Sequence, residues 1–400
     1  RRTRKRAVLV VLRPSTRPLC GRLRMMGGRP PTASVCQTDW CDPSVEETAQ
    51  VNATMIGLDI AKLSFHLDGH IRGVATSQAL ARQKVLPFFA QLEPSRIAIE
   101  ACGTAHYWGR ELEKLGHSVQ LIPARYVKPF VKRNKTDARD ATAIRIAASQ
   151  DDMRFVPVKS EEQQAARALH TAREQLVSMA TQSGNALRCQ LAEFGIIAGK
   201  GKEGLKALVE LAETGEDPRM PTMLIAAMRA LALIWRTATQ QAEVLEREIV
   251  TQAKADKLAR RLEKIPGIGW LTAHAIIAAA GDGQRFKSAR DFAAWIGLTP
   301  RTTGTGGKQW TGRITRAGDC GLRRLLVLGA SAVLRAMRSR PERCTQWVHG
   351  LLSRRPVKVA VVAQAAKTAR IVWAVLTSGK DYDPAHADKR RAKAQLVAAV

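Results

Sequence analysis

The sequence predicts an α/β domain followed by two mainly helical regions. Between residues 55 and 122, short segments alternate apolar and polar residues, and segments with helical spacing lie between them, as is typical of an α/β domain. Beyond residue 158 the segments become long and rich in Ala, Leu, Gln and Glu, with few Gly or Pro residues. Because 45% of the 400 residues are hydrophobic, the chain has enough apolar material to form folded cores.

The α/β domain is predicted over residues 55–158. Gly116 ends one helix of this domain, and Pro123 stops its last strand. Apolar alternation predicts four strands, and helical spacing predicts two helices. The strands are expected at 55–60, 64–69, 96–100 and 118–122, and the helices at 107–115 and 137–148.

The two helical regions are predicted at 159–262 and 263–380. The first is either an ordinary helical spacer or a coiled-coil arm for dimerisation or nucleic-acid binding. Its helices are expected over 161–193 and 223–262, with turns at 195–204 and 215–221. The second region is predicted to be mainly α. Its helices are expected over 271–280, 289–296, 322–338 and 357–377, with a Gly-rich loop at 303–307.

Basic segments precede and follow these regions. Residues 1–54 begin with a run of Arg and Lys and carry no acid before Asp39. A nucleic-acid arm or a targeting peptide is one interpretation of this segment. We favour a loose, disordered extension, because the periodic pattern begins only at Met55. A second basic tail is predicted over residues 381–400.

The charge of the chain predicts a polyanionic partner. The sequence has 64 Lys and Arg against 35 Asp and Glu, a formal net charge of +29. Nucleic acid is the first candidate, because so large an excess of positive charge causes self-repulsion unless a polyanion neutralises it. An acidic membrane surface is disfavoured, because the cations are spread from Arg1 to Arg391 rather than gathered in one amphipathic segment.

The cysteines and the apolar segments indicate where the chain resides. Seven Cys residues with no Cys-x-x-Cys pair support neither a disulfide framework nor a zinc ribbon, and fit a reducing cytoplasm. No apolar run reaches the roughly 18 uninterrupted residues of a membrane span. Trp108, Trp295 and Trp373 are expected to be core residues rather than base-stacking platforms.

Four acidic residues form a candidate metal site. Asp59 lies within an apolar strand, Glu100 ends another, and Asp137 and Asp140 are three residues apart at the start of a helix. Residues three apart share a helix face, and carboxylate oxygens at strand ends suit Mg²⁺. Four acids could hold two ions for phosphodiester cleavage. The alternative is that each acid is a surface charge, a helix cap or an ion-pair partner; we favour the metal site because the four occur together.

Two Gly-containing segments are candidate phosphate contacts. Pro266-Gly267-Ile268-Gly269 lies between helices and is typical of helix-hairpin-helix turns that present backbone N–H groups to a phosphate, although Gly also ends helices for structural reasons. The loop from Pro300 to Lys308 is rich in hydroxyls but lacks the Walker pattern. It either carries a hydroxyl nucleophile or only binds the nucleic-acid backbone.

These segments together resemble one family of proteins. The chain is similar to the DEDD transposases of bacterial insertion sequences, in the "IS one-ten" family and its "IS eleven-eleven" branch. The resemblance covers residues 55–380. The matching segments include Ile56-Gly57-Leu58-Asp59, Ile99-Glu100-Ala101-Cys102-Gly103, Lys128-Pro129-Phe130, Ile265-Pro266-Gly267-Ile268-Gly269 and Gly306-Gly307-Lys308.

The resemblance implies a RuvC-like (RNase H-like) domain in which Asp59, Glu100, Asp137 and Asp140 bind Mg²⁺. It also implies a coiled-coil linker that assembles homo-oligomers, a C-terminal transposase domain with a hydroxyl nucleophile, and a structured non-coding guide RNA that pairs with donor and target DNA. Such a protein would work in the bacterial cytoplasm at the nucleoid. The expected nucleic-acid contacts are Lys128, Lys132, Arg133, Lys135, Gly267, Gly269, Lys308, Arg313, Arg316 and Arg323.

The sequence departs from the family at the nucleophile. Where the family has Ser-Ser or Ser-Thr before Gly-Gly-Lys, this chain has Gly304-Thr305. Thr305 is therefore the candidate nucleophile, although its β-branch restricts χ1. Two alternatives to a recombinase follow: a RuvC-like, structure-selective nuclease that uses water, and a catalytically impaired relic that binds DNA or RNA without cutting it.

Overall fold

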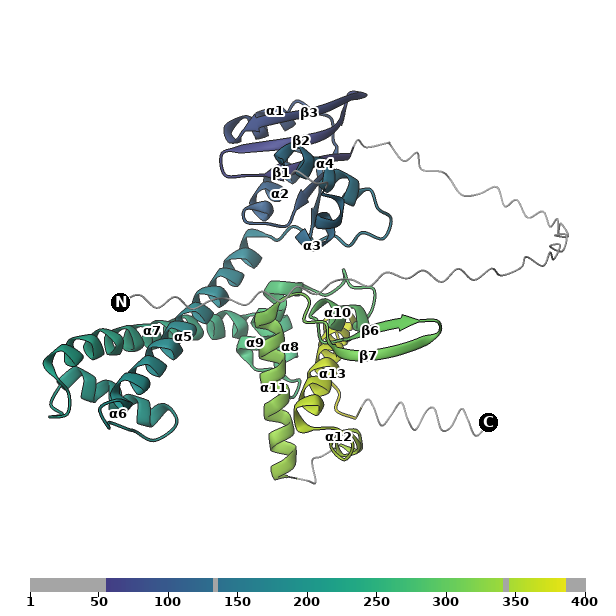
Figure 1. Cartoon of the computed structure of the whole chain (residues 1–400). Coiled ribbons are helices and arrows are strands. Elements are labelled where there is room, and N and C mark those ends of the chain that lie inside the picture. The colour runs from purple at the N-terminus through teal and green to yellow at the C-terminus, as the bar shows by residue number, and fades with distance from the viewer. Residues whose placement is uncertain (1–54, 132–135, 341–344, 386–400) are drawn as a thin grey trace, which may run out of the picture. The chain divides into compact units, whose positions relative to one another are not determined.

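The computed structural model describes residues 55–131, 136–340 and 345–385 (Figure 1). The expected N-terminal extension and most of the basic tail lie outside these residues. Three of the expected nucleic-acid contacts, Lys132, Arg133 and Lys135, also lie outside them.

The first described part of the chain contains a five-stranded mixed sheet. Its strands are β1 (Met55–Ile60), β2 (Ser64–Ile71), β3 (Val74–Ala81), β4 (Arg96–Glu100) and β5 (Ser118–Ile122). The spatial order is β3-β2-β1-β4-β5, with β1, β4 and β5 parallel and the β1-β2-β3 pairs antiparallel. The four predicted strands are confirmed, and β3 is an edge strand that the sequence analysis missed.

Helices pack against both faces of this sheet. They are α1 (Val85–Phe89), α2 (Ala105–Lys114), α3 (Ala124–Val127) and α4 (Asp137–Ala148). Ile56 and Leu58 of β1 point into a core that they share with α1 and α2. Residues of α4, including Ile144, form a second core with Ala98 and Ile122 on the other face. The two predicted helices correspond to α2 and α4, whereas α1 was not predicted.

Helix α4 can lie against β1 because residue 57 is a glycine. A Cβ atom on Gly57 would stand 2.2 Å from the carbonyl oxygen of Ala141 and 2.9 Å from Cβ of Arg145, both on α4. On the neighbouring strand, Asp68 accepts a hydrogen bond of 2.7 Å from Nε of Arg145, an ion pair that also fixes α4. The backbones of β1 and α4 are thus in direct contact, with the first turn of α4 near the end of β1.

Three long helices follow the sheet: α5 (Glu161–Ala192), α6 (Lys202–Thr214) and α7 (Thr222–Ala255). Helices α5 and α7 pack along each other, and α6 covers them through a shared apolar cluster that includes Leu187, Leu208 and Met228. The helix predicted over 223–262 is wrong as a single element. It is broken at Asp256, whose extended backbone and side chain cap a new helix, α8 (Lys257–Glu263), by accepting hydrogen bonds from Leu258 and Ala259.

The C-terminal region is mainly helical, as predicted. Besides α8 it contains α9 (Trp270–Ala280), α10 (Ala289–Trp295), α11 (Cys320–Ser339), α12 (Gln346–Leu352) and α13 (Val357–Ser378). Among the described residues, α13 is the helix long and apolar enough to cross a membrane by composition. Its buried residues Ala365, Ala369 and Val372 belong to the core that it forms with α9, α10 and α11, which explains its apolar character.

The segment predicted as a Gly-rich loop is a β-hairpin. Strands β6 (Pro300–Thr305) and β7 (Lys308–Ile314) pair in antiparallel fashion, and Gly306-Gly307 form the turn between them. Both glycines have positive φ, 54° and 78°, as a two-residue hairpin turn requires. The hairpin extends beyond the helices around it (Figure 1), and its residues from Pro300 to Arg313 are exposed.

Two histidines meet where α5 packs on α9. Nε2 of His170 lies 2.9 Å from Nδ1 of His274. Burial, the adjacent His274 and the guanidinium groups of Arg167 and Arg173 lower the pKa of His170 from 6.5 to about 4. Burial also lowers the pKa of His274. The pair is therefore neutral in the folded chain at neutral pH.

Replacement of Gly57 by Ala should destabilise the first part of the chain. The added methyl group overlaps the α4 backbone, which must shift, and overpacking of this kind costs about 1–3 kcal/mol. Thermal and urea unfolding measure the loss. Gly103→Ala is the matched control, because a Cβ there meets nothing within 4 Å. Equal stability of the two variants would contradict the close packing of α4 on β1.

Stability should fall as the pH drops from about 6.5 towards 4, because the unfolded chain binds a proton at His170 that the folded chain excludes. His170→Gln keeps a hydrogen-bonding group beside His274 but removes that titration. Its loss of thermal stability between pH 7.5 and pH 5 should be smaller than that of the unmodified chain. Exposed His349→Gln is the control. If the two variants show the same acid sensitivity, the buried pair is not its source.

Candidate metal centre

Asp59, near the C-terminal end of β1, lies on the face of the sheet that α4 covers. Side chains alternate along a strand, so Asp59 shares this face with Gly57, whereas Ile56 and Leu58 point into the opposite core. The close approach of α4 at Gly57 therefore brings the helix directly over the strand position that carries Asp59.

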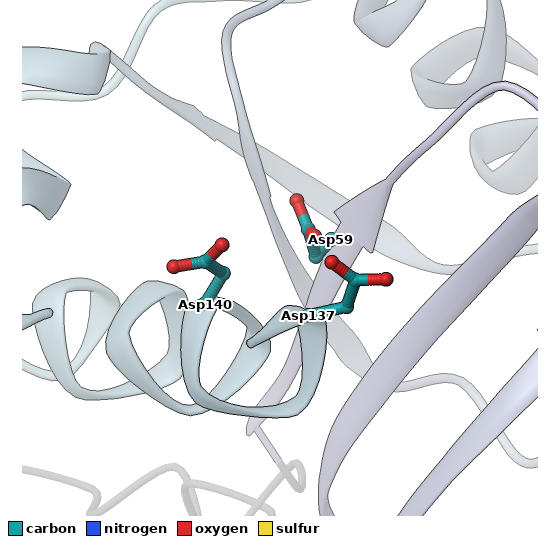
Figure 2. Close-up of side chains that lie close together, drawn as sticks. All are labelled: Asp59, Asp137 and Asp140. Atoms are coloured by element: carbon teal, nitrogen blue, oxygen red, sulfur yellow. The ribbon is translucent and has the colours of Figure 1, made fainter. Parts of the chain in front are cut away.

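The first turn of α4 supplies two more carboxylates. Thr136 caps the helix by accepting a hydrogen bond of 3.4 Å from the backbone N–H of Arg139, which fixes the start of the helix at Asp137. Asp137 and Asp140 consequently lie on the same side of the first turn (Figure 2). Asp137 is exposed, whereas Asp140 is 8% exposed.

The structure brings these three aspartates together. One carboxylate oxygen from each of Asp59, Asp137 and Asp140 lies within 4.8 Å of the others. Figure 2 shows Asp59 at the end of its strand, facing the helix turn that carries Asp137 and Asp140. The sequence prediction that these acids share one site is thus matched by their geometry, although their role as ligands stays a prediction.

Glu100 lies on the neighbouring strand and is not part of this three-residue group. Strands β1 and β4 are parallel with Leu58 opposite Ile99, so Asp59 and Glu100 are the residues that follow this pair. Burial, followed by the charges of Glu100 and Asp59, raises the pKa of the Cys102 thiol. Both carboxylates therefore act on the same thiol, which places Glu100 at the border of the aspartate cluster.

The donor chemistry of the cluster fits Mg²⁺. This ion prefers oxygen ligands in octahedral geometry at about 2.1 Å, which puts neighbouring ligand oxygens about 3 Å apart. Carboxylate oxygens within 4.8 Å of one another need only small side-chain rotations to reach that spacing. The cluster contains no histidine or thiol ligand of the kind that favours zinc.

The described nucleic-acid candidates fall into two groups. Lys128, Lys308, Arg313 and Arg316 are exposed, and so is Gly269, which precedes α9. The other two make intramolecular contacts. A Cβ on Gly267 would lie 2.9 Å from the carbonyl oxygen of Gly329, so this glycine permits close packing on α11.

Arg323 is also bound within the protein. Its Nη1 donates hydrogen bonds of 2.9 and 2.7 Å to the carbonyl oxygens of Ile296 and Ala317. These bonds tie α11 to the chain before and after the β6–β7 hairpin, so Arg323 has a clear structural role.

Thr305 ends β6 beside the hairpin turn, on a different element from the aspartates, and is exposed. It pairs with Lys308 across the hairpin. Directly opposite residues have Cβ atoms about 5 Å apart, so the Lys308 ammonium group can reach a phosphate that contacts the Thr305 hydroxyl.

Three residues near these sites, Asp68, Arg145 and Trp310, were not predicted from the sequence. The Asp68–Arg145 ion pair, which holds α4 on β2, joins residues far apart in the sequence and left no local signal. Trp310, which lies on the hairpin with 55% of its surface exposed, was also missed. The signal available in the sequence was the Gly306-Gly307 pair, which is typical of a hairpin turn, followed by a mostly polar segment that contains Trp310. Such a segment predicts a strand whose Trp faces outward.

Comparison with known proteins gives matches over most of the chain. A family model described as "Transposase IS116/IS110/IS902 family" matches residues 259–345. A second model, described as a transposase and named for the DEDD domain of IS110 elements, matches residues 56–196. A "probable family 20 transposase" of Pseudomonas aeruginosa is 44% identical over 337 residues, which cover 84% of this chain and 100% of that protein.

The chain belongs to the IS116/IS110/IS902 transposase family. The transposase for insertion sequence IS1328 of Yersinia enterocolitica is 38% identical, over 82% of this chain and 98% of that protein. The transposase for IS1111A of Coxiella burnetii is 36% identical, over 82% of this chain and 91% of that protein. The resemblance stated from the sequence is confirmed. A DEDD transposase domain implies a RuvC-like α/β fold, with which the observed mixed sheet agrees.

Addition of Mg²⁺ should stabilise the chain through the aspartate cluster. A ligand at a hundredfold excess over its Kd stabilises the folded state by about 2.7 kcal/mol. Calorimetric titration and thermal unfolding, with and without EDTA, measure both quantities. Asp140→Asn should remove most of the binding and the stabilisation, because it deletes one of the three converging carboxylates.

Asp151→Asn, at an exposed position outside the cluster, provides the control and should bind as the unmodified chain does. Magnesium binding that survives Asp140→Asn unchanged would show that the ion is held elsewhere.

Proposed function

We propose that the chain is a DNA recombinase that cuts and rejoins strands for insertion-sequence mobility. The observation that carries the proposal is the convergence of Asp59, Asp137 and Asp140 in a chain of this transposase family. We propose Asp59, Glu100, Asp137 and Asp140 as the ligands of two Mg²⁺ ions and Thr305 as the nucleophile. Bound Mg²⁺ would lower the cost of charge that develops on the phosphate during cleavage.

The proposed chemistry conserves the phosphoester bond. The Thr305 hydroxyl forms a bond to phosphorus as one P–O bond of the DNA strand breaks, which leaves a free hydroxyl on the DNA. A hydroxyl of another strand then attacks the same phosphorus and releases Thr305. Each step exchanges one phosphoester for another, so strand exchange needs no ATP. Lys308, opposite Thr305 on the hairpin, is placed to stabilise the charge on that phosphate.

The hairpin geometry supports Thr305 rather than residue 304 as the reacting position of this chain. A Cβ on Gly304 would lie 3.0 Å from the carbonyl oxygen of Lys308 and 3.2 Å from Cγ of Gln309. A family serine at 304 would therefore point to the Gln309 side of the hairpin. The hydroxyl that this chain retains, on Thr305, lies on the side of Lys308.

The partners form part of the proposal. We propose DNA ends and target DNA as substrates in the bacterial cytoplasm, and a structured non-coding RNA as guide. The dispersed excess of Lys and Arg supports contacts with both backbones. Apolar side chains exposed on α5 and α7, such as Met179 and Leu233, support the helices of residues 159–262 as the surface through which copies assemble into a dimer or tetramer.

A water-using, structure-selective nuclease is the second candidate function. The absence of the family serine at position 304 favours it, because the same carboxylates serve cleavage by water. The two functions differ in one product: the recombinase leaves protein covalently attached to DNA, and the nuclease does not.

The covalent attachment tests the proposal. The chain is incubated with Mg²⁺, the end DNA of its element and the flanking RNA, and a denaturing gel is run with and without protease. We expect a protease-sensitive DNA band that maps to Thr305 by peptide mass. Thr305→Ala should remove it, and Thr305→Ser should increase it several-fold, because serine lacks the β-branch that restricts χ1.

Asp59→Asn separates catalysis from binding in the same assay. It should abolish the adduct and any nicking while DNA binding measured by gel shift is retained. Free nicked DNA without an adduct would support the nuclease instead. No cleavage by either the unmodified chain or Thr305→Ser would identify a binding relic.

A further inference from the structure

The hairpin β6–β7 carries an aromatic side chain that no core explains. Trp310 is 55% exposed, whereas Trp108 is 3% exposed in the core of the sheet. The other described tryptophans, Trp235, Trp270, Trp295, Trp347 and Trp373, pack against apolar clusters. A large indole on a narrow two-stranded ribbon gains nothing from the fold, which points to a partner that covers it.

The pairing of the strands fixes which face of the hairpin carries Trp310. Trp310 pairs with Thr303, and Lys308 pairs with Thr305. Side chains of directly paired residues share a face, and residues two apart on a strand share it as well. These four side chains therefore project from one face, and Gln309 projects from the other.

A contact across the hairpin supports this assignment independently. Gly304 pairs with Gln309, and a Cβ built on Gly304 would meet Cγ of Gln309 at 3.2 Å. Gln309 thus lies on the face opposite Trp310, which makes it a control position on the same strand.

Trp310 and Thr305 are diagonal neighbours on their shared face. Diagonal positions of an antiparallel pair are about 7–8 Å apart, within reach of an aromatic side chain. The base and the phosphate of one nucleotide are separated by a comparable distance. A strand whose phosphate contacts Thr305 and Lys308 can therefore place an adjacent base on the indole of Trp310.

The charges around the hairpin select a polyanion as its occupant. Residues 292–318 contain no Asp or Glu but four cations, Arg301, Lys308, Arg313 and Arg316. All four are exposed. An exposed aromatic side chain among cations is the combination that binds an unpaired nucleic-acid strand, because the cations follow the backbone and the ring stacks on a base.

We propose that Trp310 stacks on an unpaired base of the DNA strand next to the phosphate held at Thr305. This inference rests on the proposed function, and it makes Trp310 a positioning residue. Stacking holds the strand so that the phosphate remains in line with the Thr305 hydroxyl. Because every base has a π-face, the contact recognises an unstacked base of any sequence.

A fluorescent base tests the stacking without requiring cleavage. The full chain carrying Asp59→Asn is titrated with a DNA duplex that contains one unpaired 2-aminopurine, a base whose fluorescence is quenched when it stacks. The fully paired duplex of the same sequence and an RNA of that sequence with the same unpaired base are compared. We expect quenching with the unpaired DNA probe and little with the paired duplex.

Variants on the two faces of the hairpin assign the signal. Trp310→Ala should abolish the quenching and weaken binding of the unpaired DNA roughly tenfold, with little effect on the paired duplex. Trp310→Phe should keep most of both, because it retains a ring. Gln309→Ala, on the opposite face, should behave as the parent protein does.

Three outcomes would overturn the proposal. These are quenching that persists in Trp310→Ala, a loss of affinity that is equal for paired and unpaired DNA, and quenching confined to the RNA probe. Failure of the proposed function has a different signature, since a chain that forms no Thr305 adduct can still quench the DNA probe through Trp310.

Discussion

The contact between the backbones of β1 and α4 is the constraint on which the candidate metal centre depends. Gly57 allows it, because any side chain at this position would overlap the carbonyl oxygen of Ala141. At this separation the first turn of α4 comes over the end of β1, where Asp59 lies. A larger separation would leave three carboxylates on one side of a sheet, too far apart to share an ion. A residue without a side chain thus determines the geometry of the residues that carry the charge.

Much of this arrangement could be predicted from the sequence because its signals are local. An acid within an apolar strand is conspicuous at Asp59, and Thr136 marks the start of α4 by a capping pattern that fixes which face Asp137 and Asp140 share. The convergence of the three aspartates is not local, since it depends on the packing of α4 on β1 at Gly57. The occurrence of four acids on strand ends and a helix start favoured a shared site, the family resemblance agreed with it, and the packing at Gly57 is the physical cause of the convergence.

The elements that were missed or predicted wrongly share one property. Their sequence signal is weak, and contacts with other parts of the chain determine their structure. Strand β3 has no buried residue and lies at the sheet edge, so its alternation carries little apolar signal. Asp256 breaks an otherwise uniform helical pattern because its side chain caps α8. The Gly-rich segment was predicted as a loop because glycine discourages strands, but Gly306-Gly307 form the turn that allows the flanking residues to pair.

The aspartate cluster and the hairpin that carries Thr305 differ in charge. This difference separates DNA binding from bond exchange in the proposed reaction. Three carboxylates repel a phosphate until cations neutralise them, so the proposed catalysis at this centre would depend on Mg²⁺. The stretch around Thr305 holds cations and no acid, so in the proposed reaction it would attract a DNA strand whether or not Mg²⁺ is bound. In the proposed recombinase, the nucleophile would therefore meet its phosphate before the metal centre is competent. DNA binding would weaken as the salt concentration rises, whereas the rate of bond exchange would depend on the concentration of Mg²⁺.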